Sequence, residues 1–130
     1  MIFSLAIYGA PYSSQSCHTA LAFAQAAIAT GHKIYRVFFY SEGVHHGSSL
    51  LTPQQDEIHF SDEWIKLSQA NHFDLVVCIA ASLKRGLIDK QEANRYEKPC
   101  TNLAEGFELS GLGQLLDAAV TSDRLITFGS

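Results

Sequence analysis

Apolar residues follow two patterns along this chain. Some lie in short continuous runs, which are typical of strands buried on both faces of a sheet. Others recur every three or four positions, which predicts helices with one buried face. The predicted strands are residues 2–8, 33–40, 73–79 and 124–128, and the predicted helices are residues 16–29, 61–70, 82–86, 89–96 and 111–120.

Turn-forming and helix-capping residues separate these elements. Residues 9–14 predict a turn, Gly31 ends the first helix, and Ser110 is expected to cap the last one. Residues 41–56 predict a polar loop, whose length is uncommon unless the loop serves a purpose. Residues 98–109 fit either a loop or a short strand. Because no linker or repeat divides the chain, we expect a single domain over residues 1–130.

Strands that alternate with helices predict right-handed crossovers and an α/β fold. We expect a three-layer α/β/α domain with a mainly parallel sheet, as in flavodoxin-like proteins. Ligands and chemistry gather at the carboxyl ends of the strands in such sheets. Three segments should therefore converge there: residues 9–16, residues 40–56 and Cys78.

Composition and charge exclude several classes of protein. The formal net charge of −4 argues against a nucleic-acid-binding surface, which needs a basic stripe. No apolar run approaches the roughly 18 residues of a membrane span, and the N-terminal run predicts a strand and not a signal peptide. The 3 cysteines form no CxxC pair, so neither a disulfide framework nor a zinc knuckle is expected. These features favour a protein of the reducing cytoplasm.

The strongest chemical signal is Cys78, at the end of the most apolar run in the chain. A polar, basic segment with Lys84 and Arg85 follows at once. Helix amides and basic side chains favour the thiolate of a nearby cysteine, so we expect an exposed nucleophile. The alternatives are that Cys78 is a small buried hydrophobe and that Lys84 and Arg85 are solvated helix charges.

A phosphatase or rhodanese loop needs a cysteine, five residues and an arginine around an oxyanion. Here the sixth position after Cys78 is Lys84, and Arg85 falls one position late. Residues 79–83 contain no glycine that would let the backbone amides curl inward. We therefore reject this class.

Other candidate residues carry weaker signals. Cys17 could be a second thiol in the same pocket, although a packing role is favoured; Cys100 is given no role. Tyr12 and Ser13 could support the site or bind an anion at the start of the first helix. Without a glycine-rich phosphate loop, flavin or nucleotide binding is a secondary alternative, and we expect no cofactor.

Three histidines lie in or after the long loop: His45, His46 and His59. Adjacent histidines in an extended loop point to opposite sides, so they do not share the helical face that metalloprotease ligands use. A metal site is therefore not expected. A histidine of this loop could instead tune Cys78 or line a surface that contacts a partner.

Four segments together resemble the DsrE/TusD family of sulfur-relay proteins, in particular its TusD-like sulfurtransferase subunits. They are residues 9–12 (GAPY), 37–44 (VFFYSEGV), 78–86 (CIAASLKRG) and 102–113 (NLAEGFELSGLG). The resemblance implies that Cys78 carries sulfur as a persulfide. It further implies a TusA-like donor, a TusE-like acceptor and TusB- and TusC-like sister subunits, in a pathway to 2-thiouridine at the tRNA wobble position.

Two alternatives to tRNA thiolation remain open. Homologues in sulfur oxidisers handle sulfur with a dissimilatory sulfite reductase, and a non-catalytic subunit of the same fold would leave Cys78 without a role.

The C-terminal third is rich in apolar residues, most of which we expect in the core. Any excess that is exposed there would be an interface. These residues are Phe107, Leu109, Leu112, Leu115 and Leu116.

Overall fold

A computed structural model describes residues 1–129 of the chain. Its strands are β1 (Ile2–Ile7), β2 (Lys33–Phe39), β3 (Asp74–Cys78), β4 (Phe107–Ser110) and β5 (Arg124–Phe128). Its α-helices are α1 (Gln15–Ala29), α2 (Phe60–Asn71), α3 (Ile79–Lys84), α4 (Lys90–Arg95) and α5 (Gly113–Thr121), and a 3₁₀ helix, η1 (Ser41–Gly47), follows β2.

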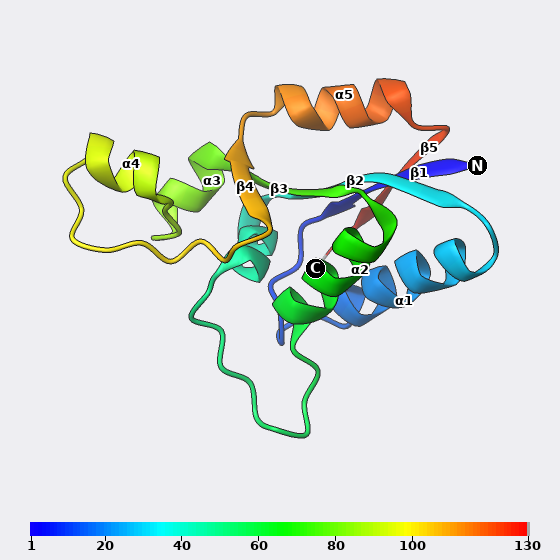
Figure 1. Cartoon of the computed structure of the whole chain (residues 1–130), viewed down its shortest axis with the longest axis horizontal. Coiled ribbons are helices and arrows are strands. Elements are labelled where there is room, and N and C mark those ends of the chain that lie inside the picture. Colours follow the sequence, from blue (N-terminus) through cyan, green and yellow to red (C-terminus); the bar gives the residue numbers. More distant parts are fainter. Residues whose placement is uncertain (130) are drawn as a thin grey trace.

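The five strands form one parallel sheet in the order β4-β3-β2-β1-β5. Helices α1 and α2 cover one face, and α5 lies alone on the other (Figure 1). Helices α3 and α4 lie beyond the edge of the sheet that carries β4 (Figure 1). The predicted three-layer α/β/α architecture with a parallel sheet is confirmed.

The central strands are apolar on both faces because both faces are covered. Leu5 and Ile7 of β1 and Val37, Phe38 and Phe39 of β2 are fully buried. Their burial removes nearly all of their apolar surface from water, and each Å² of apolar surface buried stabilises the folded state by about 25 cal/mol. The sheet is therefore a rigid support for whatever follows the ends of its strands.

The predicted polar loop over residues 41–56 is partly wrong. Its first part is the helix η1, in which Gly43, Val44, His46 and Gly47 are buried. A Cβ at Gly43 would lie 2.1 Å from the carbonyl oxygen of Ile7, so only glycine lets η1 approach β1 this closely. The polar and glycine residues of this segment predicted a loop, although the segment forms a helix that packs against the sheet.

Three further boundaries differ from the prediction. Helix α3 begins at Ile79, directly after Cys78, and not at residue 82. Ser110 ends β4 and does not cap a helix, because α5 starts at Gly113 with Leu112 as its N-cap. The ambiguous residues 98–109 contain the start of β4, an edge strand too short for its alternation to be recognised.

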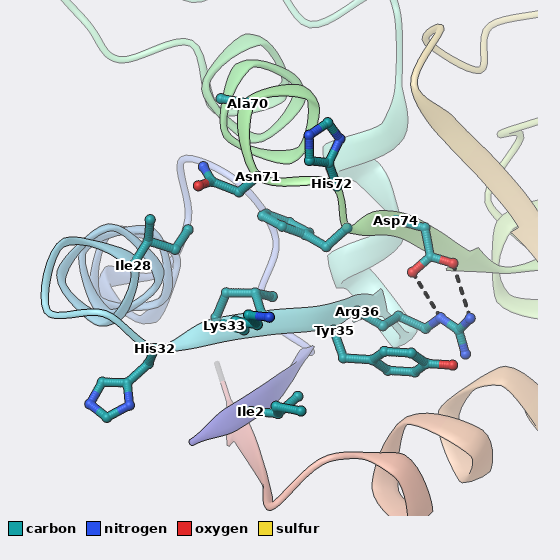
Figure 2. Close-up of a pocket in the computed structure, with 12 residues that line it drawn as sticks. Ile2, Ile28, His32, Lys33, Tyr35, Arg36, Ala70, Asn71, His72 and Asp74 are labelled. Carbon is teal, nitrogen blue, oxygen red and sulfur yellow. Dashed lines mark hydrogen bonds and ion pairs between the residues drawn. The ribbon is translucent and has the colours of Figure 1, made fainter.

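At the amino ends of the strands, Arg36 is a buried cation that connects three elements. Its guanidinium donates to both carboxylate oxygens of Asp74, each at 3.0 Å, and to Asp117 on α5 at 2.9 Å. Figure 2 shows Arg36 and Asp74 facing each other beside a cavity of about 820 Å³. This cavity is at the opposite edge of the sheet from Cys78, and two of its charged wall residues, Arg36 and Asp74, are already paired with each other.

Candidate functional site

Cys78 is the last residue of β3 and the N-cap of α3. It lines a cavity of about 420 Å³ at the carboxyl edge of the sheet. The other walls are the segment after β2 (Tyr40 and Ser41), the first turns of α3, and the segment after β4 (Gly111 and Leu112). A thiol thus lies where a parallel sheet collects its functional residues.

The thiol is less open than the sequence predicted. Cys78 exposes only 3% of its surface, so the expectation of a freely exposed nucleophile is wrong. The reason is that α3 begins at the next residue and contacts η1, β3 and β4. Cys78 does line the cavity, so this is the side from which a partner would approach it.

Two cations line the same cavity, as the sequence suggested. Arg85 makes an ion pair with Glu42 of η1 and also donates to the carbonyl of Ala81 at 3.1 Å. Hydrogen bonding to Arg85 holds the pKa of the Glu42 carboxyl below its usual value. The exposed Lys84 has no ion pair among residues 1–129, so its charge is available to an anion in the cavity.

Tyr12 and Ser13 do not line this cavity. The Tyr12 hydroxyl donates to the carbonyl of Ile58 at 2.8 Å and accepts from the amide of Phe60 at 3.2 Å. Tyr12 therefore braces the start of α2, and Ser13 is exposed on the turn beside it. The predicted convergence of residues 9–16 with Cys78 is wrong, because this loop folds toward α2.

Cys17 has the packing role that the sequence favoured. It is fully buried, and its thiol donates to the carbonyls of Gly9 at 3.4 Å and Ala10 at 3.2 Å. Burial raises the pKa of the Cys17 thiol. It does not line the Cys78 cavity. Cys100 is an exposed free cysteine in the segment after α4.

The histidines lie in three different environments. His46 is fully buried against Phe39 and Phe60, with ring centroids 5.2 and 5.5 Å away, and neither of its nitrogens has a partner among the described residues. Burial lowers the pKa of His46 to about 3, and the nearby Gly9 carbonyl opposes this only in part. His45 lies 3.7 Å from Glu42, whereas His59 caps α2. Among residues 1–129, no three His, Cys, Asp or Glu side chains are grouped as metal ligands.

The sequence did not identify several residues around Cys78. The predicted convergence of residues 40–56 with Cys78 is confirmed for Tyr40 and Ser41, which line the cavity. Gly111 and Leu112 also line it and were not identified, nor was Glu42 as the partner of Arg85. One signal could have found them: each follows the carboxyl end of a strand that neighbours β3. Recognising it requires the strand order, because β4 was not identified from the sequence as the neighbour of β3.

The chain belongs to the DsrE/DsrF-like family, which it matches over residues 1–128. It is 46% identical to the "Sulfurtransferase TusD homolog" of Pseudomonas aeruginosa, over 99% of this chain and 98% of that protein. The "Sulfurtransferase TusD" of Photorhabdus laumondii is 44% identical over 97% and 96%. A protein named DsrE from Allochromatium vinosum is 46% identical over 99% of both chains. The predicted DsrE/TusD family, whose named members are sulfurtransferases, is thus confirmed.

The fold also has a solved counterpart. The crystal structure of the YchN protein from E. coli superposes with a TM-score of 0.75 at 22% identity, covering 98% of this chain and 97% of that one. At this identity the likeness establishes the fold and nothing further. Within the described part of the chain, no helix combines the length and apolar character needed to cross a bilayer.

Proposed function

We propose that this protein is a sulfurtransferase that accepts sulfur on Cys78 as a persulfide and passes it to a downstream thiol. The observation that carries the proposal is the position of Cys78 at the β3–α3 junction, on the wall of a cavity that also contains Lys84. Of the other two cysteines, Cys17 is sealed in the core, and Cys100 is exposed outside the cavity.

The transfer needs no oxidant or cofactor. The Cys78 thiolate attacks the terminal sulfur of a donor persulfide, a bond forms between the two sulfurs, and the donor leaves as a thiolate. An acceptor thiolate then attacks the terminal sulfur of the Cys78 persulfide, and Cys78 leaves as a thiolate. Each step forms one sulfur–sulfur bond and breaks one, so the protein is unchanged after a full cycle.

Lys84 and Arg85 have different parts in this proposal. Lys84 supplies a positive charge that stabilises the anionic sulfur, because charge-assisted contacts are stronger than neutral ones. Arg85 is held by Glu42 and by the carbonyl of Ala81. It therefore fixes α3 against η1 as a positioning residue.

For the pathway, we favour a cytoplasmic relay from a TusA-like donor to a TusE-like acceptor, leading to 2-thiouridine at the tRNA wobble position. The names of the TusD relatives support this choice. Transfer in sulfur oxidation is the second candidate, supported by the 46% identity to the DsrE protein of Allochromatium vinosum. The acceptor protein that is loaded by the Cys78 persulfide distinguishes the two.

We further propose that the chain works in an assembly with TusB- and TusC-like sister subunits. Leu112, Leu116 and Val120 recur every four residues along α5 and expose 51%, 67% and 77% of their surfaces. Such an apolar stripe on the single helix of one sheet face is typical of a surface covered by another protein.

The sulfur-carrier function is tested by incubating the protein with cysteine persulfide and measuring its intact mass. We expect the gain of one sulfur atom, and we expect Cys78→Ser to abolish it. Cys17→Ser and Cys100→Ser are the matched controls and should keep the gain. Labelling that survives Cys78→Ser would show that the site is misassigned, and no labelling of the unmodified chain would favour a non-catalytic subunit.

A further inference from the structure

A second hollow lies beside the Cys78 cavity, between α3 and α4. Its walls are Leu83, Lys84, Ile88, Tyr96 and Lys98, and its volume is about 430 Å³. We call it the α3–α4 hollow. Its floor is apolar, Tyr96 is half exposed at the end of α4, and its only charged wall residues are two lysines.

The hollow and the Cys78 cavity share one residue. Lys84 lines both, so a chain bound in the hollow lies against a residue that also borders the Cys78 cavity. Cys78 itself is nearly buried, and a protein thiol must therefore be guided into its cavity. A second contact beside the entrance supplies that guidance.

The chemistry of the walls indicates the occupant. Leu83, Ile88 and Tyr96 offer an apolar surface to one inserted side chain, and Lys84 and Lys98 flank it with positive charge. Lys98 is exposed and, like Lys84, has no ion pair among residues 1–129. An apolar residue accompanied by Asp or Glu satisfies both features.

We propose that the α3–α4 hollow is the docking site for an acidic segment, carrying one apolar anchor, of the protein that exchanges sulfur with Cys78. The inference rests on the proposed function of Cys78 and adds the chemical class of its protein partner. Two lysines on a chain of net charge −4 are too few for a nucleic-acid surface, which favours a peptide segment over RNA.

Synthetic peptide persulfides test this directly. One peptide carries a leucine and aspartates next to a persulfidated cysteine, a second replaces the aspartates with lysines, and cysteine persulfide serves as the probe without a docking segment. The readout is the second-order rate constant for sulfur transfer to Cys78, measured by quenched mass spectrometry. We expect the acidic peptide to react about tenfold faster than the basic one at low salt, a difference of about 1.4 kcal/mol, because the aspartates pair with the two exposed lysines and the lysines of the basic peptide are repelled by them.

Two variants locate the effect. Lys98→Glu should lower the ratio of the acidic-peptide rate to the cysteine-persulfide rate about tenfold, and Tyr96→Ala should lower this ratio for both peptides. Lys66→Glu, an equally exposed lysine on α2, is the matched control and should leave the ratio unchanged. The preference for the acidic peptide should also weaken as salt is added.

The outcomes separate this inference from the proposed function. Equal rates for the acidic and basic peptides would overturn the docking site, as would a Lys98→Glu effect no larger than that of Lys66→Glu. So would inhibition by a short single-stranded RNA and not by the unmodified acidic peptide. In each of these cases loading of Cys78 by cysteine persulfide would still support the sulfur carrier, whereas its absence would reject the proposed function itself.

Discussion

At the residue scale, His46 makes the fold sensitive to acid. Its ring is fully buried without a hydrogen-bond partner among the described residues, and burial lowers its pKa from 6.5 to about 3. The folded state therefore holds the neutral ring, while the unfolded state takes up a proton below about pH 6.5. The free energy of unfolding is therefore unaffected by His46 above pH 6.5, and it decreases as the pH falls from 6.5 toward 3.

This predicts a measurable difference between pH 7 and pH 5. The free energy of unfolding of the unmodified protein should fall by about 2 kcal/mol more than that of His46→Leu over this range, since each pH unit below 6.5 costs about 1.4 kcal/mol. Urea unfolding at the two pH values measures it. Identical pH dependence in His46→Leu would contradict the assignment.

Residues differ in how far the sequence reveals them. Cys78 could be found because an apolar run ends at it and basic residues follow, and this pattern needs no knowledge of distant segments. Its burial could not be predicted, because it depends on α3 starting at the next residue. Nor could Glu42 be identified as the partner of Arg85, since the two are 43 positions apart and meet only when η1 packs beside α3.

At the element scale, η1 is the part of the site that the sequence hides most. A run of polar and glycine residues resembles a loop, yet a side chain at Gly43 would collide with its surroundings, and one at Gly47 would make a tight contact. A Cβ at Gly43 would meet the backbone of β1 at 2.1 Å, and one at Gly47 would meet a side chain of β3 at 3.2 Å. Because η1 also carries Ser41 and Glu42, its packing against β1 sets one wall of the Cys78 cavity.

Gly43→Ala should therefore weaken both the fold and the site. We expect the free energy of unfolding to fall by about 3 kcal/mol, the upper end of the cost of overpacking, because a backbone carbonyl cannot move aside. Loading of Cys78 by cysteine persulfide should also slow, since η1 shifts away from Arg85. Chemical unfolding and mass spectrometry measure the two effects.

The matched control for this prediction is Gly113→Ala. Gly113 begins α5, and nothing lies within 4 Å of its added Cβ. Alanine there should be neutral or stabilise the protein by up to about 1 kcal/mol. Equal stability of Gly43→Ala and Gly113→Ala would show that the approach of η1 to β1 is not tight.

At the scale of the whole molecule, the alternation of strands and helices was sufficient to predict the three layers and the parallel sheet. The strand order was not predictable in the same way. β4 is a four-residue edge strand in a segment without clear alternation, yet it brings Gly111 and Leu112 beside Cys78. Pairing between distant segments thus completes the candidate site, of which the sequence alone identified Cys78 and the two cations after it.

The two faces of the sheet also differ in how well they are covered, and this determines where other subunits can bind. Helices α1 and α2 share one face, while α5 alone covers the other (Figure 1). On α5, Leu116 and Val120 are exposed to solvent. Leu112 belongs both to this stripe and to the Cys78 cavity. A subunit that covers the stripe would therefore reach the entrance of the cavity, and assembly would help to decide which thiols enter.

The double variant Leu116→Glu and Val120→Glu should release the chain from the proposed assembly. Co-expressed with TusB- and TusC-like proteins, the proposed partners, the unmodified chain is expected to elute with them, and the variant as a monomer of 14.3 kDa, because charges placed in an apolar interface must be desolvated without partners. Size-exclusion chromatography with mass detection measures this. Ala26→Glu, on the exposed side of α1 across the sheet, should leave the complex intact. Neither variant alters a wall of the cavity, so both should still load Cys78 from cysteine persulfide. Co-elution of the double variant with the other subunits would show that the interface lies elsewhere.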